Sequence, residues 1–174
     1  YYCPDISTAI ECGGVDVYCP ANSQAPVNAT PGLYTIPLTA PVSRRTGETR
    51  CEAGHYCSGG VRRVCGGINK WCSAGLDAPI PVSSGYYSVP MDAHDNQRTG
   101  QQLCEAGYAC NGNGTRVLCP TELQASTPEG SSECQSIKCD AGYYCPDINT
   151  RFECGGVDVY CPANSQAPVN ATPG

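Results

Sequence analysis

Fifteen cysteines are the residues whose type and spacing carry the clearest chemistry in this 174-residue sequence. At such density thiols either hold metal ions or form disulfides. No two cysteines have the Cys-x-x-Cys spacing of a zinc site, and the chain has only two histidines, so zinc ligation is disfavoured. We therefore predict disulfides and an oxidising compartment, which means an extracellular or cell-surface location.

Asparagine glycosylation is the second chemistry that the sequence offers. The acceptor pattern Asn-x-Ser/Thr occurs at Asn28, Asn113 and Asn170. Pro31 and Pro173 directly follow the first and third patterns, which lowers the occupancy expected there. An unmodified polar loop is the alternative at each position. Covalent glycans are the expected additions to the chain, and no cofactor is predicted.

Catalytic and metal-binding residues do not stand out. His55 occupies the position that Tyr108 and Tyr143 hold in related segments, so we interpret it as a packing residue. His94 lies in a predicted loop without a Cys or Ser partner. We expect no enzyme activity and no metal site, because the acidic residues lack the dense alternation of a calcium loop; those considered are Asp5, Asp16, Asp147 and Asp158.

Charge and composition exclude further classes. The formal net charge is −6 and no basic run is present, which disfavours a nucleic-acid partner. No apolar stretch approaches the roughly 20 residues that cross a bilayer, so no membrane insertion is expected in this part of the chain. One Phe, one Trp and one Met are too few for an ordinary core. Disorder is the competing interpretation of this composition, and the regular spacing of the cysteines argues against it.

Internal repeats dominate the organisation of the chain. Residues 143–174 repeat residues 1–32 at an offset of 142, and the two segments differ at only three positions: Ser7/Asn149, Ala9/Arg151 and Ile10/Phe152. A weaker repeat with an offset of 53 relates Cys19 to Cys72 and Tyr34 to Tyr87. A period of this length is typical of an array of similar modules.

The pattern Cys-Glu/Asp-Ala-Gly-aromatic-x-Cys marks each module boundary, at 51–57, 104–110 and 139–145. It predicts three modules, 1–54, 55–107 and 108–142, and at 143–174 the start of the next 142-residue super-repeat. We interpret the sequence as a window from a longer polypeptide. The cysteines then form groups of four, of which the first keeps three members, Cys3, Cys12 and Cys19.

Spacing alone does not determine how these cysteines pair. Our working hypothesis joins the first to the third and the second to the fourth cysteine of each group. It leaves Cys12 unpaired in this window. The predicted bonds are Cys3–Cys19, Cys51–Cys65, Cys57–Cys72, Cys104–Cys119, Cys110–Cys134, Cys139–Cys154 and Cys145–Cys161.

The segment 110–145, CNGNGTRVLCPTELQASTPEGSSECQSIKCDAGYYC, resembles the ephrin-receptor-like cysteine-rich repeat. It is also similar in style to the cysteine-rich modules of tumour-necrosis-factor and growth-factor receptors. The shared features are the Cys-x-x-Gly-Tyr-x-Cys junction and the Ser-x-x-Glu-Gly-Ser-Ser-x-Cys stretch. The two longer modules resemble variants found in tandem in large surface proteins of protists and algae. The resemblance implies an extracellular, disulfide-rich rod without catalytic residues.

Short β-hairpins must position these cysteines, because Gly and Pro interrupt every segment long enough for a helix. We predict strands at 15–18, 33–36, 86–89 and 157–160. Two hairpins are expected, over 32–51 and 85–104, with polar tips near 40–46 and 92–98. The predicted fold is small, disulfide-rich and mostly irregular, with tandem modules in an elongated, solenoid-like rod.

These patterns favour a non-catalytic structural role. We expect the backbone of an extracellular, glycosylated fibril, of the flagellar-hair or surface-filament type, that self-associates with copies of itself or with adjoining repeats. The alternative is a receptor or adhesin ectodomain, in which the repeats form a stalk or a ligand-binding module. A secreted inhibitor or toxin-like module would have to be a small standalone domain, which the tandem repeats disfavour.

Overall fold

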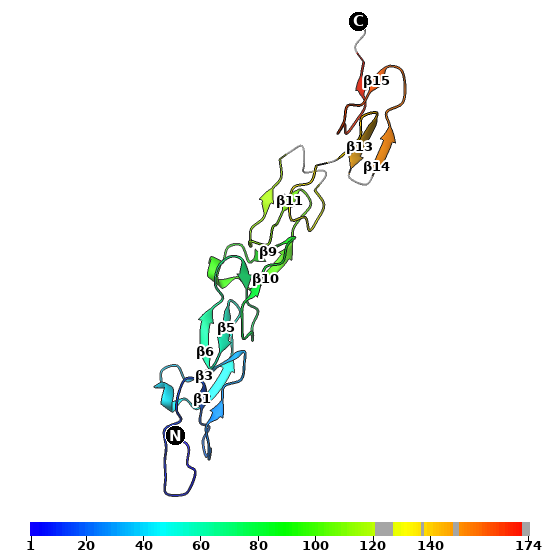
Figure 1. Cartoon of the computed structure of the whole chain (residues 1–174). Helices are drawn as coiled ribbons and strands as arrows, with labels where there is room; N and C mark the ends of the chain where they lie inside the picture. Colours follow the sequence, from blue (N-terminus) through cyan, green and yellow to red (C-terminus); the bar gives the residue numbers. More distant parts are fainter. Residues whose placement is uncertain (121–126, 137, 148–149, 172–174) are drawn as a thin grey trace. The chain divides into compact units, whose positions relative to one another are not determined.

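The computed structural model describes residues 1–120, 127–136, 138–147 and 150–171 (Figure 1). The contacts within the chain divide it into two compact units. Unit 1 comprises Tyr1–Ser83, Tyr87–Gln102 and Asn113–Thr115. Unit 2 comprises Ser84–Tyr86, Leu103–Gly112 and Arg116–Gly174.

Every sheet among the described residues is a pair of short strands that follow one another along the chain. The only helices in this part of the chain are two single 3-10 turns, η1 (Val42–Arg44) and η2 (Asp95–Gln97). The strand pairs are β1 (Val17–Tyr18) with β2 (Val27–Asn28), β3 (Leu33–Ile36) with β4 (Gly47–Arg50), β5 (His55–Ser58) with β6 (Val61–Val64), β7 (Lys70–Trp71) with β8 (Ile80–Pro81), β9 (Tyr86–Val89) with β10 (Gly100–Leu103), β11 (Tyr108–Ala109) with β12 (Val117–Leu118), β13 (Tyr143–Asp147) with β14 (Thr150–Glu153), and β15 (Val159–Tyr160) with β16 (Val169–Asn170).

The two hairpins predicted over 32–51 and 85–104 are confirmed as β3–β4 and β9–β10, and a 3-10 turn lies in the loop of each. The strands predicted at 15–18 and 157–160 are shorter than expected. β1 and β15 begin two residues late, at Val17 and Val159. In the first of these segments Val15 and Asp16 form a turn, and the Asp16 carbonyl accepts a hydrogen bond from the Ala29 N–H.

Glycine allows the sharp turn inside the boundary pattern. Gly54 has φ +82° and is followed directly by β5, and the His55 N–H donates to the Glu52 carbonyl across this turn. Gly107 and Gly142 have similar positive φ values, of 82° and 88°, in the other two boundary patterns. Residues with a Cβ adopt this conformation only at a cost, which explains why the pattern contains Gly at this place.

Most of the buried hydrophobic residues are cysteines. Apart from Tyr34, Val82 and Tyr87, every buried hydrophobic residue that the structure describes is a cysteine. Thr35 and Ser88 are also buried, and their hydroxyls donate hydrogen bonds to backbone carbonyls. The small hydrophobic content of the sequence is therefore matched by a small core. Such a core leaves much of the stability to cross-links.

Seven disulfides form among the described residues, and their pairing corrects our working hypothesis. The structure joins the first cysteine of each group to the second and the third to the fourth. Cys12, predicted to be unpaired, is bonded to Cys19, and Cys3 is the free, exposed cysteine. The remaining bonds are Cys51–Cys57, Cys65–Cys72, Cys104–Cys110, Cys119–Cys134, Cys139–Cys145 and Cys154–Cys161.

Local turns explain this pairing. The turn at Gly54 brings the Cα atoms of Cys51 and Cys57 to 5.7 Å, and a second turn brings those of Cys65 and Cys72 to the same distance. Both values lie in the normal range for a disulfide. The hypothesis paired alternate cysteines of each group and overlooked that six or seven residues with a glycine turn are enough to close a bond.

Tryptic mapping of the unreduced protein distinguishes the two pairings. Cleavage after Arg50, Arg62, Arg63, Lys70 and Arg98 separates the peptides 51–62, 64–70 and 71–98. With the pairing seen here, peptide 51–62 is released alone with an internal disulfide, while 64–70 stays joined to 71–98. A species in which 51–62 is linked to either of the other peptides would support the first–third, second–fourth pairing instead.

Candidate functional site

The same set of backbone hydrogen bonds surrounds each boundary pattern. In unit 1 the Gly54 N–H donates to the Cys72 carbonyl, and the Gly75 N–H donates to the Cys51 carbonyl, both at 2.8 Å. Unit 2 repeats the second bond from Gly130 to Cys104 and from Asn164 to Cys139. A positive φ occurs at Gly75, Gly130 and Asn164 alike. The boundary pattern thus specifies one small folded motif that the chain uses three times.

Unit 1 also contains a tight contact between the predicted modules 1–54 and 55–107, which we call the junction. The hydroxyl of Thr35 on β3 donates to the Val15 carbonyl at 2.9 Å, and the Thr35 N–H donates to the Gly60 carbonyl at 3.0 Å. Gly60 lies so close to Val15 that a Cβ there would overlap the Val15 carbonyl oxygen, and it would lie 3.2 Å from the Cα of Asp16. Three segments thus meet through their backbones, with Thr35 completely buried between them.

A second junction in unit 1 has the same construction. The Ser88 N–H donates to the Gly114 carbonyl at 3.0 Å, as the Thr35 N–H does to Gly60. The Ser88 hydroxyl, also buried, donates to the Gly114 carbonyl at 3.1 Å. A Cβ on Gly114 would overlap the carbonyl oxygen of Ile68. Relative to the first junction, Ile68 and Ser88 lie 53 residues further along the chain and Gly114 lies 54 residues further.

The loops of the two hairpins add one more repeated bond. The Cys19 N–H donates to the Arg45 carbonyl, and the Cys72 N–H donates to the Arg98 carbonyl, both at 2.9 Å. The Arg45 side chain also contacts the junction, where it donates a hydrogen bond to the Thr35 hydroxyl at 2.8 Å. Each hairpin is therefore attached to the disulfide that precedes it as well as to the glycine that follows it.

Ion pairs accompany the boundary pattern. Glu52 pairs with Arg62 at 3.4 Å and accepts a hydrogen bond from the Tyr34 hydroxyl at 2.8 Å. This hydrogen bond raises the pKa of Tyr34, and burial and the Glu52 charge act in the same direction. Burial opposes ionisation of Glu52, but the bonds from Tyr34 and Arg62 hold its pKa below the usual value.

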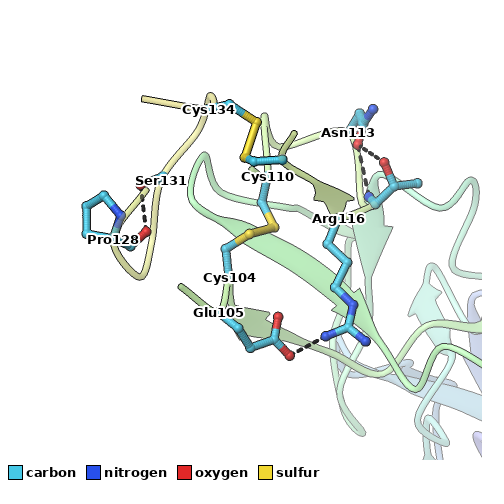
Figure 2. The surroundings of a disulfide bond; sticks show 10 residues. Cys104, Glu105, Cys110, Asn113, Arg116, Pro128, Ser131 and Cys134 are labelled. Carbon is cyan, nitrogen blue, oxygen red and sulfur yellow. Dashed lines mark hydrogen bonds and ion pairs between the residues drawn. A yellow bond between two sulfur atoms is a disulfide. The ribbon is translucent and has the colours of Figure 1, made fainter. Parts of the chain in front are cut away.

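Unit 2 has the same kind of acid–arginine pair at its two boundary patterns. Glu105 pairs with Arg116 (Figure 2), whose guanidinium lies over the Tyr108 ring. Asp140 pairs with Arg151 at 3.1 Å, and Arg151 lies 3.6 Å from the centre of the Tyr143 ring. Exposed pairs of this kind contribute up to about 1 kcal/mol each, so they support the turns without determining them.

The predicted glycosylation sites lie on the surface as far as the structure describes them. Asn28 on β2, Asn113 and Asn170 on β16 are exposed. Near Asn28, the Thr30 hydroxyl donates to Glu48 at 2.8 Å, whereas the Thr115 hydroxyl donates to the side chain of Asn113 itself at 2.7 Å. Thr172, the hydroxyl residue of the third pattern, lies outside the described residues.

The histidines remain apart from one another. His55 lies half-buried on β5, opposite Val64, and His94 lines an open groove with Asp92, Asp95 and the pair Gly66-Gly67. Within the described ranges, no three His, Cys, Asp or Glu side chains gather as a metal ion would require. The same part of the chain has no helix with the length and apolarity to span a bilayer.

Sequence reasoning missed the residues that form the junctions. A positive φ occurs at Gly13, Gly66 and Gly155, each of which directly follows a cysteine. Sequence reasoning did not single out Gly60 or Gly114. The available signal was a glycine three or four residues after the second cysteine of the boundary pattern, together with a small hydroxyl residue after Tyr34 and Tyr87.

A substitution of Gly60, with the same substitution of the neighbouring Gly59 as control, tests the tight contact at the junction. Gly60→Ala should lower the free energy of unfolding by about 3 kcal/mol or more, because the methyl group meets a backbone carbonyl. Gly59→Ala should cost only about 1–2 kcal/mol, since Gly59 also has a positive φ but open space around it. Denaturant unfolding of both variants measures the difference, and equal losses would contradict the tight junction.

Enzymatic removal of N-glycans from the protein secreted by eukaryotic cells tests the surface asparagines. We expect a loss of mass, with Asn113 more fully occupied than Asn28 because Pro31 follows the first pattern. Asn113→Gln and Asn28→Gln should each remove one glycan from the intact mass. An unchanged mass after treatment of the parent chain would show that these asparagines form unmodified polar loops.

Comparison with known proteins adds no relative. No protein-family model matches the sequence, and no curated protein is significantly similar to it.

Proposed function

We propose that this chain is a non-catalytic structural repeat protein that forms the backbone of an extracellular, glycosylated fibril, such as a flagellar hair or another surface filament. Seven disulfides are typical of an extracellular or secreted protein.

The recurrence of one junction is the observation that carries the proposal. Thr35 with Gly60 and Ser88 with Gly114 make the same backbone contact about 53 residues apart. A module that contacts its successor in the same way each time can be extended without a new kind of interface. Identical head-to-tail contacts generate an open filament when their rotation does not close a ring.

The near-identity of residues 1–32 and 143–174 supports the same conclusion at a longer period. Only three of these positions differ between the copies. A ligand-binding ectodomain needs a surface that is unique to one place, whereas a polymer needs equivalent surfaces. Such close similarity therefore favours the elongated, tandem array over the stalk of a receptor or adhesin.

The disulfides suit a protein that carries mechanical load. The bonds Cys51–Cys57, Cys104–Cys110 and Cys139–Cys145 each close a loop around the point where the chain passes from one predicted module to the next. A closed loop of six or seven residues limits the unfolded states available there, which is worth roughly 2 kcal/mol per bond in the chain-entropy model. The junctions themselves are held by hydrogen bonds. The disulfides thus restrict the chain at each module boundary, and the hydrogen bonds hold adjacent modules together.

Immunoelectron microscopy of native, unreduced cell-surface material tests the fibril. Antibodies against residues 91–98, a segment that occurs once in the complete super-repeat 1–142, should label long fibres at constant intervals. Label confined to short projections that end at a membrane or a distinct head would contradict the fibril and favour a stalk.

Disruption of the same fibres tests the role of the disulfides. The fibres should dissociate at a lower urea concentration when a reductant is present than in urea alone, because reduction opens the loops that the disulfides close at the module boundaries. Reductant without urea serves as the control. The same dissociation point with and without reductant would show that the cross-links do not support the fibre.

A further inference from the structure

The side chain of Asn113 is held in a turn directly beside the second junction. Its carbonyl oxygen, Oδ1, accepts hydrogen bonds from the Thr115 N–H at 2.9 Å and from the Thr115 hydroxyl at 2.7 Å (Figure 2). A backbone N–H can only donate, so the side-chain atom that faces it is the oxygen and not the nitrogen of the amide. The two bonds therefore fix both the place and the direction of this amide.

The ring that this turn closes contains the two atoms that a cyclisation would join. It runs from Oδ1 through Cγ of Asn113 and the backbone nitrogen of Gly114 to the Thr115 N–H. The carbonyl carbon Cγ and the Gly114 nitrogen are thus kept near each other, which favours an intramolecular reaction. No side chain hinders the approach of that nitrogen, because residue 114 is glycine.

The same hydrogen bonds activate the amide for attack. When a nucleophile adds to Cγ, negative charge develops on Oδ1. Donors that already point at this oxygen stabilise the charge, as they do in an oxyanion hole. Asn113 has two such donors, the N–H and the hydroxyl of Thr115. The turn thus brings together a nearby nucleophile and a polarised carbonyl.

We propose that Asn113 is a site of spontaneous deamidation and that this reaction opens the second junction. The Gly114 nitrogen attacks Cγ, the Cγ–Nδ2 bond breaks, and the proton of the Gly114 N–H passes through solvent to Nδ2, which leaves as ammonia. Water then opens the resulting succinimide. Addition at Cγ gives aspartate with the normal backbone, and addition at the main-chain carbonyl carbon gives isoaspartate. Overall, water is consumed and ammonia is released in equal amounts.

Isoaspartate inserts an extra methylene group into the backbone immediately before Gly114. The Gly114 carbonyl accepts hydrogen bonds from the Ser88 N–H at 3.0 Å and from the Ser88 hydroxyl at 3.1 Å. Gly114 also lies so close to the Ile68 carbonyl that a Cβ would overlap its oxygen. A longer backbone at this place displaces Gly114 from both contacts. The first junction is not subject to the reaction, because Gly59 precedes Gly60 there.

Deamidation and glycosylation concern the same atom of Asn113. The predicted glycan would be attached to Nδ2, which is the atom that deamidation expels. A chain with isoaspartate at position 113 can therefore no longer carry a glycan there. The deamidation proposal depends neither on the glycan nor on the fibril, so its test uses the protein without glycans.

Peptide mapping during storage tests the reaction. The 174-residue chain with Cys3→Ser, which removes the free thiol, is produced in an oxidising compartment without N-glycosylation and incubated at neutral pH. Brief tryptic digestion after reduction yields peptide 99–116, which contains both Asn-Gly pairs of the sequence, Asn111-Gly112 and Asn113-Gly114. Electron-transfer fragmentation distinguishes isoaspartate from aspartate at each position, and position 111 serves as the internal reference.

Two substitutions of Thr115 form a matched pair. Thr115→Val removes the hydroxyl that donates to Oδ1 at nearly constant shape, whereas Thr115→Ser keeps it. We expect Thr115→Val to slow isoaspartate formation at position 113, relative to position 111, by roughly threefold or more, since one donor to the oxyanion is lost. Thr115→Ser should react like the parent. Equal rates in the three chains, or no isoaspartate at position 113 of the parent, would overturn the proposal.

Hydrogen exchange at the Ser88 amide measures the effect on the junction. After incubation, the isoaspartyl fraction should exchange this amide roughly tenfold or more faster than the fresh chain, while the Thr35 amide of the first junction stays unchanged. Asn113→Gln cannot form the five-membered ring, so its Ser88 amide should exchange at the same rate before and after incubation. Unchanged exchange of Ser88 in the isoaspartyl fraction would contradict the opening of the junction.

Discussion

Backbone groups of successive predicted modules approach one another closely at the junctions, beside one buried hydroxyl side chain at each, and the remaining features of each module bring these groups together. Gly60 approaches the Val15 carbonyl more closely than any residue with a Cβ can, and Thr35 is enclosed between the two. The β3–β4 hairpin presents Thr35, and the turn at Gly54 directs β5 and β6 so that Gly60 follows at the right place. A contact of this kind depends on backbone shape, so it can recur wherever the same short pattern recurs.

Cross-links make such a contact possible in a chain with few large apolar side chains. A conventional domain of this length would hold its loops by burying Leu, Ile and Phe, but here the buried residues are mainly half-cystines. Closed loops of six or seven residues restrict the unfolded chain, and the backbone hydrogen bonds then complete a small motif. The surface is left to polar residues and to apolar side chains such as Val157 and Ile6 that the described structure leaves exposed.

The repeats, the two large hairpins and the lack of long helices in the described residues were predictable, because composition, period and strand preference all agree on them. The disulfide pairing was not, since four closely spaced cysteines admit several connectivities and the turn at Gly54 decides between them. The junction residues could not be identified from the sequence either. Gly60 and Gly114 are two among 20 glycines, and their role depends on the carbonyl groups of Val15 and Ile68, which are distant in sequence. Exposure of Asn28, Asn113 and Asn170 agrees with their place in polar loops and strand ends, while their modification stays a prediction.

The central claim is that two junctions of the same construction exist within one chain. Nuclear Overhauser effects test it most directly, because they report proton pairs that lie close together. The account predicts contacts from the α-protons of Gly60 to Asp16 and from those of Gly114 to Asn69, at similar intensity in the oxidised protein. If either pair were absent while the hairpins β3–β4 and β9–β10 were intact, the modules would not share one junction, and the case for a repeating array would fail.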